Sequence, residues 1–371
     1  MNKLVRKTNK LKSKTSFIKA VIYKPTLPMN KYLKDDWLMY LIFLVVAIVV
    51  AREINTNNKP TEQITFQEKQ PDYWLAPSLY SDNITKGEQR KLIIYGEDLI
   101  ANTSKYFGPN GSVLQISNGM NCQNCHLDAG TRSWGNNYGA VASTYPKFRE
   151  RSGSIENIPK RVNDCFERSL NGQAIDTSGY EMKSIIAYIN WLGQNVKKGE
   201  KPKGAGIVDL PYLDRAASLI KGKVVYNQKC QSCHAANGEG MKNLNEVSYT
   251  YPPLWGKQSY NDGAGLYRLS RLAGYVKDNM PFNQATHQAP LLTDEEAWDV
   301  AAFINSQPRP KANMKNDWPN ISGKPIDHPF GPYTDGFTEE QHKYGPFKPI
   351  VAKRKEMKKM ASAVEANITK K

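Results

Sequence analysis

Four segments of the chain are expected to form helices, and they fall into two pairs. The early member of each pair spans 87–102 or 213–228, and the late member spans 181–193 or 294–306. In the late segments apolar residues recur at a spacing near 3.6, as on one face of a helix. The two late segments align without gaps, with Ala-Tyr-Ile-Asn at 187–190 over Ala-Phe-Ile-Asn at 302–305. This repeat predicts a mainly α-helical protein with two similar domains in tandem.

A different pattern opens the chain. Ten Lys and Arg residues precede Trp37, and the fifteen residues 37–51 are uncharged. A basic flank before an apolar run keeps the N-terminus in the cytoplasm, so everything after residue 52 is expected to be exported. The run is short for a transmembrane anchor, which needs about 20 residues. It also fits a signal peptide with cleavage after Ala51. Either way, we expect the body on the periplasmic side of the bacterial inner membrane.

The net charge of +16 has a local origin. Residues 1–52 carry eleven Lys and Arg, and the tail from Val351 carries seven against two Glu. The body, 53–350, holds 33 basic and 31 acidic residues and is nearly neutral. A nucleic-acid partner is therefore not expected, because duplex binding needs a concentrated basic surface.

Four of the five cysteines belong to two Cys-x-x-Cys-His motifs, the attachment signature of c-type heme. The residues concerned are Cys122, Cys125, His126, Cys230, Cys233 and His234. A redox dithiol and a zinc site are the competing interpretations. Redox motifs do not need the trailing histidine, and in a zinc site two such histidines would be coincidental. We therefore expect two covalently bound heme c groups, with His126 and His234 as proximal iron ligands.

The repeat also predicts the distal iron ligands. Small cytochromes carry this ligand on the loop before the last helix, and in the second half that loop, 277–283, contains Met280. The offset of 115 residues between the late helices places Cys165 at the matching position in the first half. No histidine lies between the two motifs; Met120 is too close to the attachment site, and Met182 lies too late. Cys165 is therefore the expected ligand of the first heme and Met280 that of the second.

Two other interpretations of Cys165 stay open: a small buried hydrophobic residue and an intermolecular disulfide. As a ligand, its thiolate would lower the potential of the first heme, whereas a thioether raises that of the second. Several basic or hydroxyl residues surround it in sequence: Arg149, Arg151, Lys160, Arg161, Arg168 and Ser169. Arginine pairs suit small dianions such as thiosulfate. The same residues also suit heme propionates.

With these motifs the chain resembles the thiosulfate dehydrogenases, diheme c-type cytochromes that interconvert thiosulfate and tetrathionate. The resemblance covers roughly residues 85–350 and is carried by CQNCHLDAG, NNYGAVASTYPKFRERSGSIENIPKRVNDCFERSLNG, CQSCHAANGEG, the NMPF loop and HPFGPYTDGFTEEQHKYGPF. It implies an active site at the first heme, with Cys165, Arg151, Arg161 and Ser169 as its residues. It also implies electron transfer through the second heme to an external cytochrome or oxidase, with Cys165 leaving the iron and forming a sulfur adduct. The direction of the reaction stays open.

One departure from the family concerns the residue before Met280. Some members have a lysine there that exchanges with the methionine, but this chain has Asn279. The nearest lysine, Lys277, lies three residues before Met280. We therefore expect Met280 to remain the ligand.

Two other functions compete with this one. A membrane-tethered diheme electron carrier would have no substrate, and a methionine at 165 would have favoured it. A Sox-type sulfur-oxidising subunit also uses cysteine-ligated heme but normally needs a partner. His287, His328 and His342 are expected to be surface or packing residues.

The expected organisation is a basic segment 1–36, an anchor or signal helix 37–51, a tether 52–86, a first domain 87–195, a linker 196–212, a second domain 213–308, a wrapping extension 309–350 and a basic tail 351–371 that frays or lies on the membrane.

Overall fold

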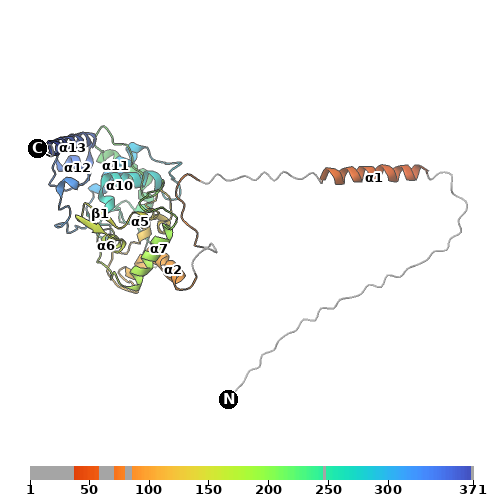
Figure 1. Cartoon of the computed structure of the whole chain (residues 1–371), viewed down its shortest axis with the longest axis horizontal. Coiled ribbons are helices and arrows are strands. Elements are labelled where there is room, and N and C mark those ends of the chain that lie inside the picture. The colour runs from red at the N-terminus through yellow and green to blue at the C-terminus, as the bar shows by residue number, and fades with distance from the viewer. Residues whose placement is uncertain (1–36, 58–70, 80–85, 245–247, 369–371) are drawn as a thin grey trace, which may run out of the picture. The chain divides into compact units, whose positions relative to one another are not determined.

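The computed structural model describes residues 37–57, 71–79, 86–244 and 248–368 (Figure 1). It divides into two units, Met1–Lys69 and Gln70–Lys371. In the first unit, α1 (Trp37–Asn57) contains the uncharged run, and its apolar side chains are exposed. No helix among the described residues combines the length and apolar character that a membrane crossing requires. The expected basic segment 1–36 and parts of the expected tether lie outside the described residues.

The first part of unit 2 is a helical module closed by two long helices. α2 packs on α7, and the buried residues between them include Ile93, Leu99, Ile185 and Tyr188. A small antiparallel hairpin pairs Lys147 of β1 with Glu156 of β2. The elements of this first module are α2 (Glu88–Ala101), α3 (Thr103–Phe107), η1 (Cys122–Asn124), α4 (Leu127–Gly130), α5 (Val141–Thr144), β1 (Lys147–Arg149), β2 (Ser154–Glu156), α6 (Ile158–Arg168) and α7 (Tyr180–Leu192).

A second module repeats this plan. α11 packs on α8 and on α10, around a core that includes Tyr226, Leu272, Trp298 and Ile304. Its elements are α8 (Leu219–Lys229), α9 (Gln231–His234), β3 (Met241–Lys242), β4 (Tyr249–Tyr251), η2 (Gly265–Tyr267), α10 (Leu269–Asn279) and α11 (Asp294–Ser306). The mainly helical, duplicated fold expected from the sequence is confirmed.

A glycine at the helix crossing explains the shared plan of the two modules. A Cβ on Gly96 of α2 would lie 2.0 Å from the carbonyl oxygen of Ser184 in α7. A Cβ on Gly222 of α8 would lie 1.9 Å from the carbonyl oxygen of Asp299 in α11. Only a residue without a side chain permits these close backbone contacts. Each glycine therefore sets how closely its first and last helices pack.

The helix expected at 213–228 begins six residues later than predicted. α8 begins at Leu219, where the Ser218 side chain accepts a hydrogen bond from the Lys221 amide. The preceding residues are held by tertiary contacts, since the Ala217 amide donates to the carbonyl of Tyr344. By contrast, the last expected helix has its exact expected bounds of 294–306 as α11, and Thr293 forms a capping box with Glu296.

The C-terminal extension contacts both modules. Its amide at Trp318 donates to the carbonyl of Arg151, 2.7 Å away in the first module. The extension contains η3 (Ile321–Gly323) and α12 (Glu339–Tyr344), and α13 (Lys348–Ile368) begins in it and continues into the basic tail.

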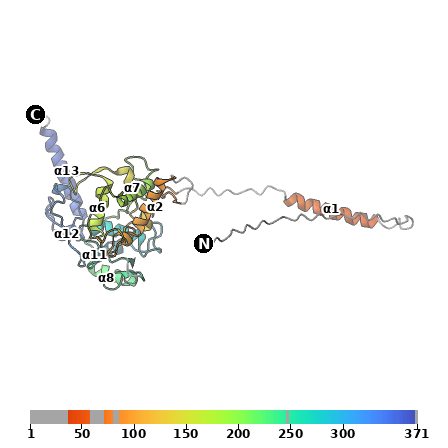
Figure 2. The ribbon, with the colours of Figure 1, turned by 90° about the horizontal axis from the view of Figure 1, so that it is seen from below.

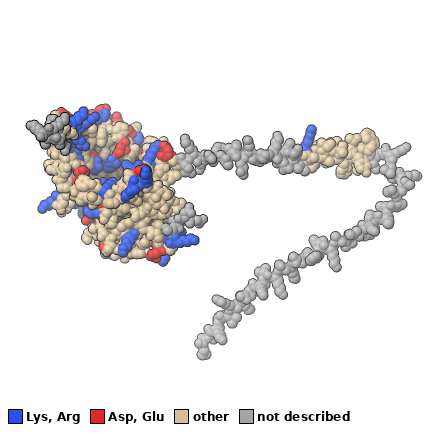
Figure 3. Space-filling model, viewed as in Figure 1, with Lys and Arg blue, Asp and Glu red and all other residues tan. Residues whose placement is uncertain are grey.

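The basic tail, which is expected to fray or to lie on the membrane, continues the helix α13 up to Ile368. Ile350 in the first turn of α13 is fully buried, and Arg354 Nε donates to Asp335 at 2.5 Å, so the base of this helix is fixed to the body. Figure 2 shows its C-terminal end projecting beyond the other elements. Figure 3 shows Lys and Arg gathered near this end, whereas basic and acidic residues are mixed over the rest of the visible body.

Two candidate heme sites

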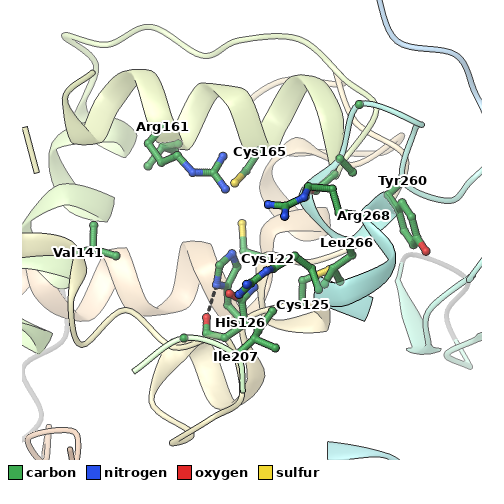
Figure 4. A pocket seen from close by; sticks show the side chains of 18 of the residues that line it. Cys122, Cys125, His126, Val141, Arg161, Cys165, Ile207, Tyr260, Leu266 and Arg268 are labelled. Atoms are coloured by element: carbon green, nitrogen blue, oxygen red, sulfur yellow. Dashed lines mark hydrogen bonds between the residues drawn. The ribbon is translucent and has the colours of Figure 1, made fainter. Parts of the chain in front are cut away.

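A cavity of about 540 Å³ is lined by the first Cys-x-x-Cys-His motif and by one face of α6. Figure 4 shows Cys165 and Arg161 of α6 pointing into this cavity from one side and His126 from the other. Cys122 and Cys125 also line it. The volume lies within the range of about 300–1,000 Å³ that is usual for ligand and cofactor pockets.

The local structure prepares His126 to bind a metal. Its Nδ1 lies 2.5 Å from the carbonyl oxygen of Asn136. Because a carbonyl only accepts, Nδ1 carries the proton, and the lone pair of Nε2 is left for a metal. Burial lowers the pKa of His126 to about 4, which keeps the imidazole neutral. The ring of Tyr138 stacks on it at 4.5 Å and fixes its orientation.

His234 repeats this arrangement in the second module. Its Nδ1 lies 2.8 Å from the carbonyl oxygen of Pro252, and burial lowers its pKa. A second cavity of about 190 Å³ is lined by His234 together with Cys230, Cys233 and Met280. At both sites, then, two thiols, an imidazole with a free Nε2 and one further sulfur line the same cavity. This donor set fits heme c.

The two predicted distal ligands differ in local structure. Met280 directly follows α10, but Cys165 lies inside α6, which begins after an Asn157 cap that accepts from the Lys160 amide. Arg161 and Cys165 are four residues apart on that helix, so they share a face. The repeat in the sequence thus aligned a mid-helix residue with a post-helix residue. Near Met280, Lys277 donates to the carbonyl of Leu292 at 2.6 Å and pairs with Asp294 at 2.8 Å.

The basic residues around Cys165 separate into paired and unpaired groups. Arg151 pairs with the buried carboxylate of Asp164, to which Lys160 also donates at 2.5 Å. Arg168 makes two hydrogen bonds to Asp317, at 2.9 and 2.8 Å. In the part of the chain that the structure describes, the Arg161 guanidinium has no carboxylate partner, and the negative charge of a Cys165 thiolate raises its pKa. Among the basic residues of α6, Arg161 is thus the one without an ion pair to a described residue.

All four residues expected at the active site line the first cavity: Cys165, Arg151, Arg161 and Ser169. The amide of Ser169 donates to the carbonyl of Cys165 at 2.9 Å, at the end of α6. Arg149 lines the cavity as well, whereas Lys160 and Arg168 are not among the lining residues.

Several lining residues were not anticipated: Lys147, Lys201, Arg268, Arg271, Trp318 and His328. They come from the hairpin, the stretch between the modules, the second module and the extension. His328 was expected only to pack or to lie on the surface; it is buried, and it accepts a hydrogen bond from Trp318 at 2.9 Å. No spacing in the sequence signals these residues, because tertiary folding alone brings them to the cavity.

The two cavities share part of their walls. Met120, Cys125, Tyr260 and Leu266 line both. In addition, the hydroxyl of Tyr275, on α10, donates to the carbonyl of Asn124 in the first motif at 2.9 Å. The two candidate heme sites therefore adjoin one another within unit 2.

Fold and sites together define a c-type cytochrome with two heme-binding domains, and comparisons with known proteins agree. Residues 219–308 match the family model described as cytochrome c. Residues 114–197 match the model described as the SoxA/TsdA cytochrome c domain.

The chain is also similar to whole proteins, each named thiosulfate dehydrogenase. The relative from Psychrobacter arcticus is 39% identical over 208 residues, which cover 55% of this chain and 61% of that protein. The relative from Stutzerimonas stutzeri is 31% identical over 251 residues, covering 64% of this chain and 78% of that protein. The relative from Allochromatium vinosum is 37% identical over 199 residues, covering 53% and 72%.

A solved structure of thiosulfate dehydrogenase (TsdBA) from Marichromatium purpuratum superposes with a TM-score of 0.59 at 28% identity, covering 74% of this chain and 54% of that one. The present chain therefore belongs to the thiosulfate dehydrogenase family, as the sequence motifs indicated. It spans less than two thirds of the Psychrobacter relative and about half of the solved chain.

Proposed function

We propose that the chain is an exported diheme cytochrome c oxidoreductase that interconverts thiosulfate and tetrathionate at the His126/Cys165 site. One observation carries this proposal: a thiol and an unpaired guanidinium on the same face of α6 point into a cavity opposite His126. Family membership supplies the substrate, since the relatives are named for thiosulfate.

The cavity is suited to a sulfur dianion. Arg161 offers charge-assisted donors, which are about twice as strong as neutral ones. We assign Ser169 as a further donor at the end of α6. Arg151 is held by Asp164, so we assign it to shaping the field of the site and to contacting the distal part of the substrate.

The proposed chemistry balances with Cys165 as the residue that carries the sulfur adduct. Its thiolate and the outer sulfur of one thiosulfate form a sulfur–sulfur bond with loss of two electrons. The thiolate sulfur of a second thiosulfate then displaces Cys165, which leaves as a thiolate while tetrathionate forms. The net change is 2 S2O3(2−) → S4O6(2−) + 2 e−. Two bound hemes would supply two one-electron acceptors, one for each electron.

The different iron ligands assigned to the two sites would give their hemes different reduction potentials. A heme held by His126 and Cys165 would have a lower potential than one held by His234 and Met280, because a thiolate ligand lowers the potential and a thioether raises it. The shared wall of the two cavities supports rapid transfer between them. We propose that an external cytochrome or oxidase exchanges electrons with the second site. The reduction potential of this external partner sets whether thiosulfate is oxidised or tetrathionate is reduced.

We also propose the domain limits and the location. Cytochrome c domains at 87–195 and 213–308 are supported by the two separate hydrophobic cores. Export to the periplasmic side, with residues 37–51 as an anchor or signal segment, is supported by the uncharged run and its basic flank. Fractionation of cells that express the full chain tests the location, and a cytoplasmic, soluble pool without heme would contradict it.

A two-direction assay tests the activity. Purified, heme-loaded protein is mixed with thiosulfate and ferricyanide, or with tetrathionate and a reduced dye. We expect turnover in at least one direction without any partner protein, and loss of that turnover in Cys165→Gly. Glu167→Gln is the control, because Glu167 is exposed on the same helix. Absence of turnover in both directions, with both hemes loaded, would instead indicate an electron carrier.

A further inference from the structure

We propose that Arg268, from the second module, is an anion-binding residue of the first heme site. The inference deepens the proposed function, on which it rests for the identity of the substrate. Arg268 immediately precedes α10 and lines the first cavity, although its own module contains the other heme motif. Figure 4 shows its guanidinium directed into the cavity that also receives Arg161 and Cys165.

A buried carboxylate orients this guanidinium. Nε and Nη2 of Arg268 donate to Oδ1 of Asp327, at 2.8 and 2.5 Å. Asp327 has a fully buried side chain and also accepts from the amide and hydroxyl of Ser270, at 3.0 and 2.5 Å. Burial alone would raise the pKa of Asp327, but the Arg268 charge and the Ser270 hydrogen bonds outweigh it and lower that pKa. Asp327 therefore stays ionised and holds one edge of the guanidinium.

The other edge of the guanidinium is available. Arg268 is 31% exposed, and its Nη1 makes no hydrogen bond to any residue that the structure describes. A planar guanidinium that is held on one side presents its remaining N–H groups in a fixed direction. The arrangement is that of a preoriented donor rather than of a solvated surface arginine.

Basic residues outnumber acidic ones in the lining of the cavity, which favours the binding of an anion. Its described lining contains seven basic residues, Lys147, Arg149, Arg151, Arg161, Lys201, Arg268 and Arg271, and two acidic ones, Asp262 and Asp317. Both acidic residues are paired with cations outside the lining, Lys311 and Arg168. Four of the basic residues are likewise paired with carboxylates outside the lining: Arg149, Arg151, Arg268 and Arg271. Three lining cations have no ion pair with any residue that the structure describes: Lys147, Arg161 and Lys201. Burial, together with the charges of Arg149 and Arg161, lowers the pKa of Lys147, as expected where cations crowd together. Anionic oxygens are the groups that relieve this excess of positive charge.

Two sources of anionic oxygen fit the site: the sulfonate end of a thiosulfate or tetrathionate molecule, and a heme carboxylate. Each group presents at least two oxygens that can accept hydrogen bonds from the fixed edge of the guanidinium. Either way, the second module completes the first site, so neither module would form that site alone.

Equilibrium binding and potentiometry on the full heme-loaded chain distinguish these sources. Tetrathionate is titrated by calorimetry into ferric protein that carries Cys165→Ser, which has neither electrons nor a thiolate with which to react. The midpoint potential of the first heme is measured separately, without substrate, in protein that retains Cys165. Both measurements compare wild-type Arg268 with Arg268→Gln and Arg268→Lys.

The matched control is Arg215→Gln. Arg215 also lies in the second module, is 35% exposed and donates to a buried aspartate, Asp299, but does not line the cavity. A change shared by both glutamine variants would therefore report general structural damage. Arg268→Lys keeps the charge but lacks the fork geometry, so we expect it to lie between wild type and Arg268→Gln.

If the substrate supplies the oxygen, Arg268→Gln weakens tetrathionate binding roughly tenfold to a hundredfold, as the loss of one charge-assisted hydrogen bond predicts. If a heme carboxylate supplies it, the midpoint potential of the first heme falls in Arg268→Gln and binding is unchanged. If Arg268→Gln alters neither quantity, or alters them no more than Arg215→Gln does, the proposal is overturned. Failure of the proposed function gives a different result. The Cys165→Ser protein with wild-type Arg268 then binds no tetrathionate, and the midpoint potential of the first heme alone tests the role of Arg268.

Discussion

The ion pair between Arg168 and Asp317 fastens the C-terminal extension to α6. Its two hydrogen bonds measure 2.9 and 2.8 Å, and the side chains are only 14% and 13% exposed. The neighbouring Trp318 amide bonds to the Arg151 carbonyl, so this contact brings the extension to the rim of the first cavity. The perturbation is to replace the pair by apolar residues of similar length, as Arg168→Met, Asp317→Leu and the double variant.

The structure sets the expected magnitudes. Removing one member leaves the other charge largely buried without a partner, which costs about 3–5 kcal/mol. Because both side chains keep slight exposure, we expect the lower end, about 3 kcal/mol of unfolding free energy for each single variant. The double variant leaves no orphaned charge. We therefore expect the double variant to cost no more than either single variant, which corresponds to a coupling energy of about 3 kcal/mol, at the top of the usual range for contacting residues.

The assay is chemical denaturation of the heme-loaded protein, with the free energy of unfolding read for all four members of the cycle. The exposed pair Lys91–Glu88, 72% and 63% exposed, provides a matched cycle, and there we expect a coupling energy below about 0.5 kcal/mol. Additive single effects at Arg168 and Asp317 would refute the reasoning, because they would mean that the pair contributes nothing jointly.

Three further predictions concern stability, each measured by thermal melting of the heme-loaded protein. Burial alone would raise the pKa of Asp335, but hydrogen bonds from Arg354 and His342 lower it. The ionised Asp335 therefore stabilises the folded protein above the unfolded pKa of about 3.9, and this contribution is lost as pH falls through the folded pKa. Asp335→Asn should therefore be destabilised at pH 7, with a gap from wild type that shrinks below pH 4; a constant gap would contradict this. Thr293→Ala removes the α11 capping box and should cost about 1 kcal/mol, with Thr293→Ser largely restoring it. Gly96→Ala forces a Cβ to 2.0 Å from a backbone oxygen and should cost about 1–3 kcal/mol or more; an unchanged melting temperature would contradict the close crossing.

Features encoded locally could be predicted from the sequence. The two Cys-x-x-Cys-His motifs are contiguous, and α11 has both an apolar periodicity and a Thr293 cap, so its bounds agreed to the residue. The repeat between the halves needed only one fixed offset to single out Cys165. That residue lines the first cavity, although the helix around it differs from the structure around Met280.

Features that depend on long-range contacts could not be predicted. Arg268 is about 100 residues from Cys165 in sequence, and only the packing of the second module brings it to the cavity. The role of Arg168 was equally hidden, because its partner Asp317 lies in an extension without periodicity. The start of α8 at Leu219 depends on contacts of the preceding residues with Tyr344, which the local pattern does not encode.

The most direct test of the account is electron paramagnetic resonance of the fully oxidised protein. If Cys165 binds the iron opposite His126, the wild type shows a low-spin thiolate-ligated signal beside that of the second heme. Cys165→Met removes this signal and leaves the second unchanged, while Glu167→Gln alters neither. A spectrum that is the same in wild type and Cys165→Met would contradict the ligand assignment and the sulfur chemistry built on it.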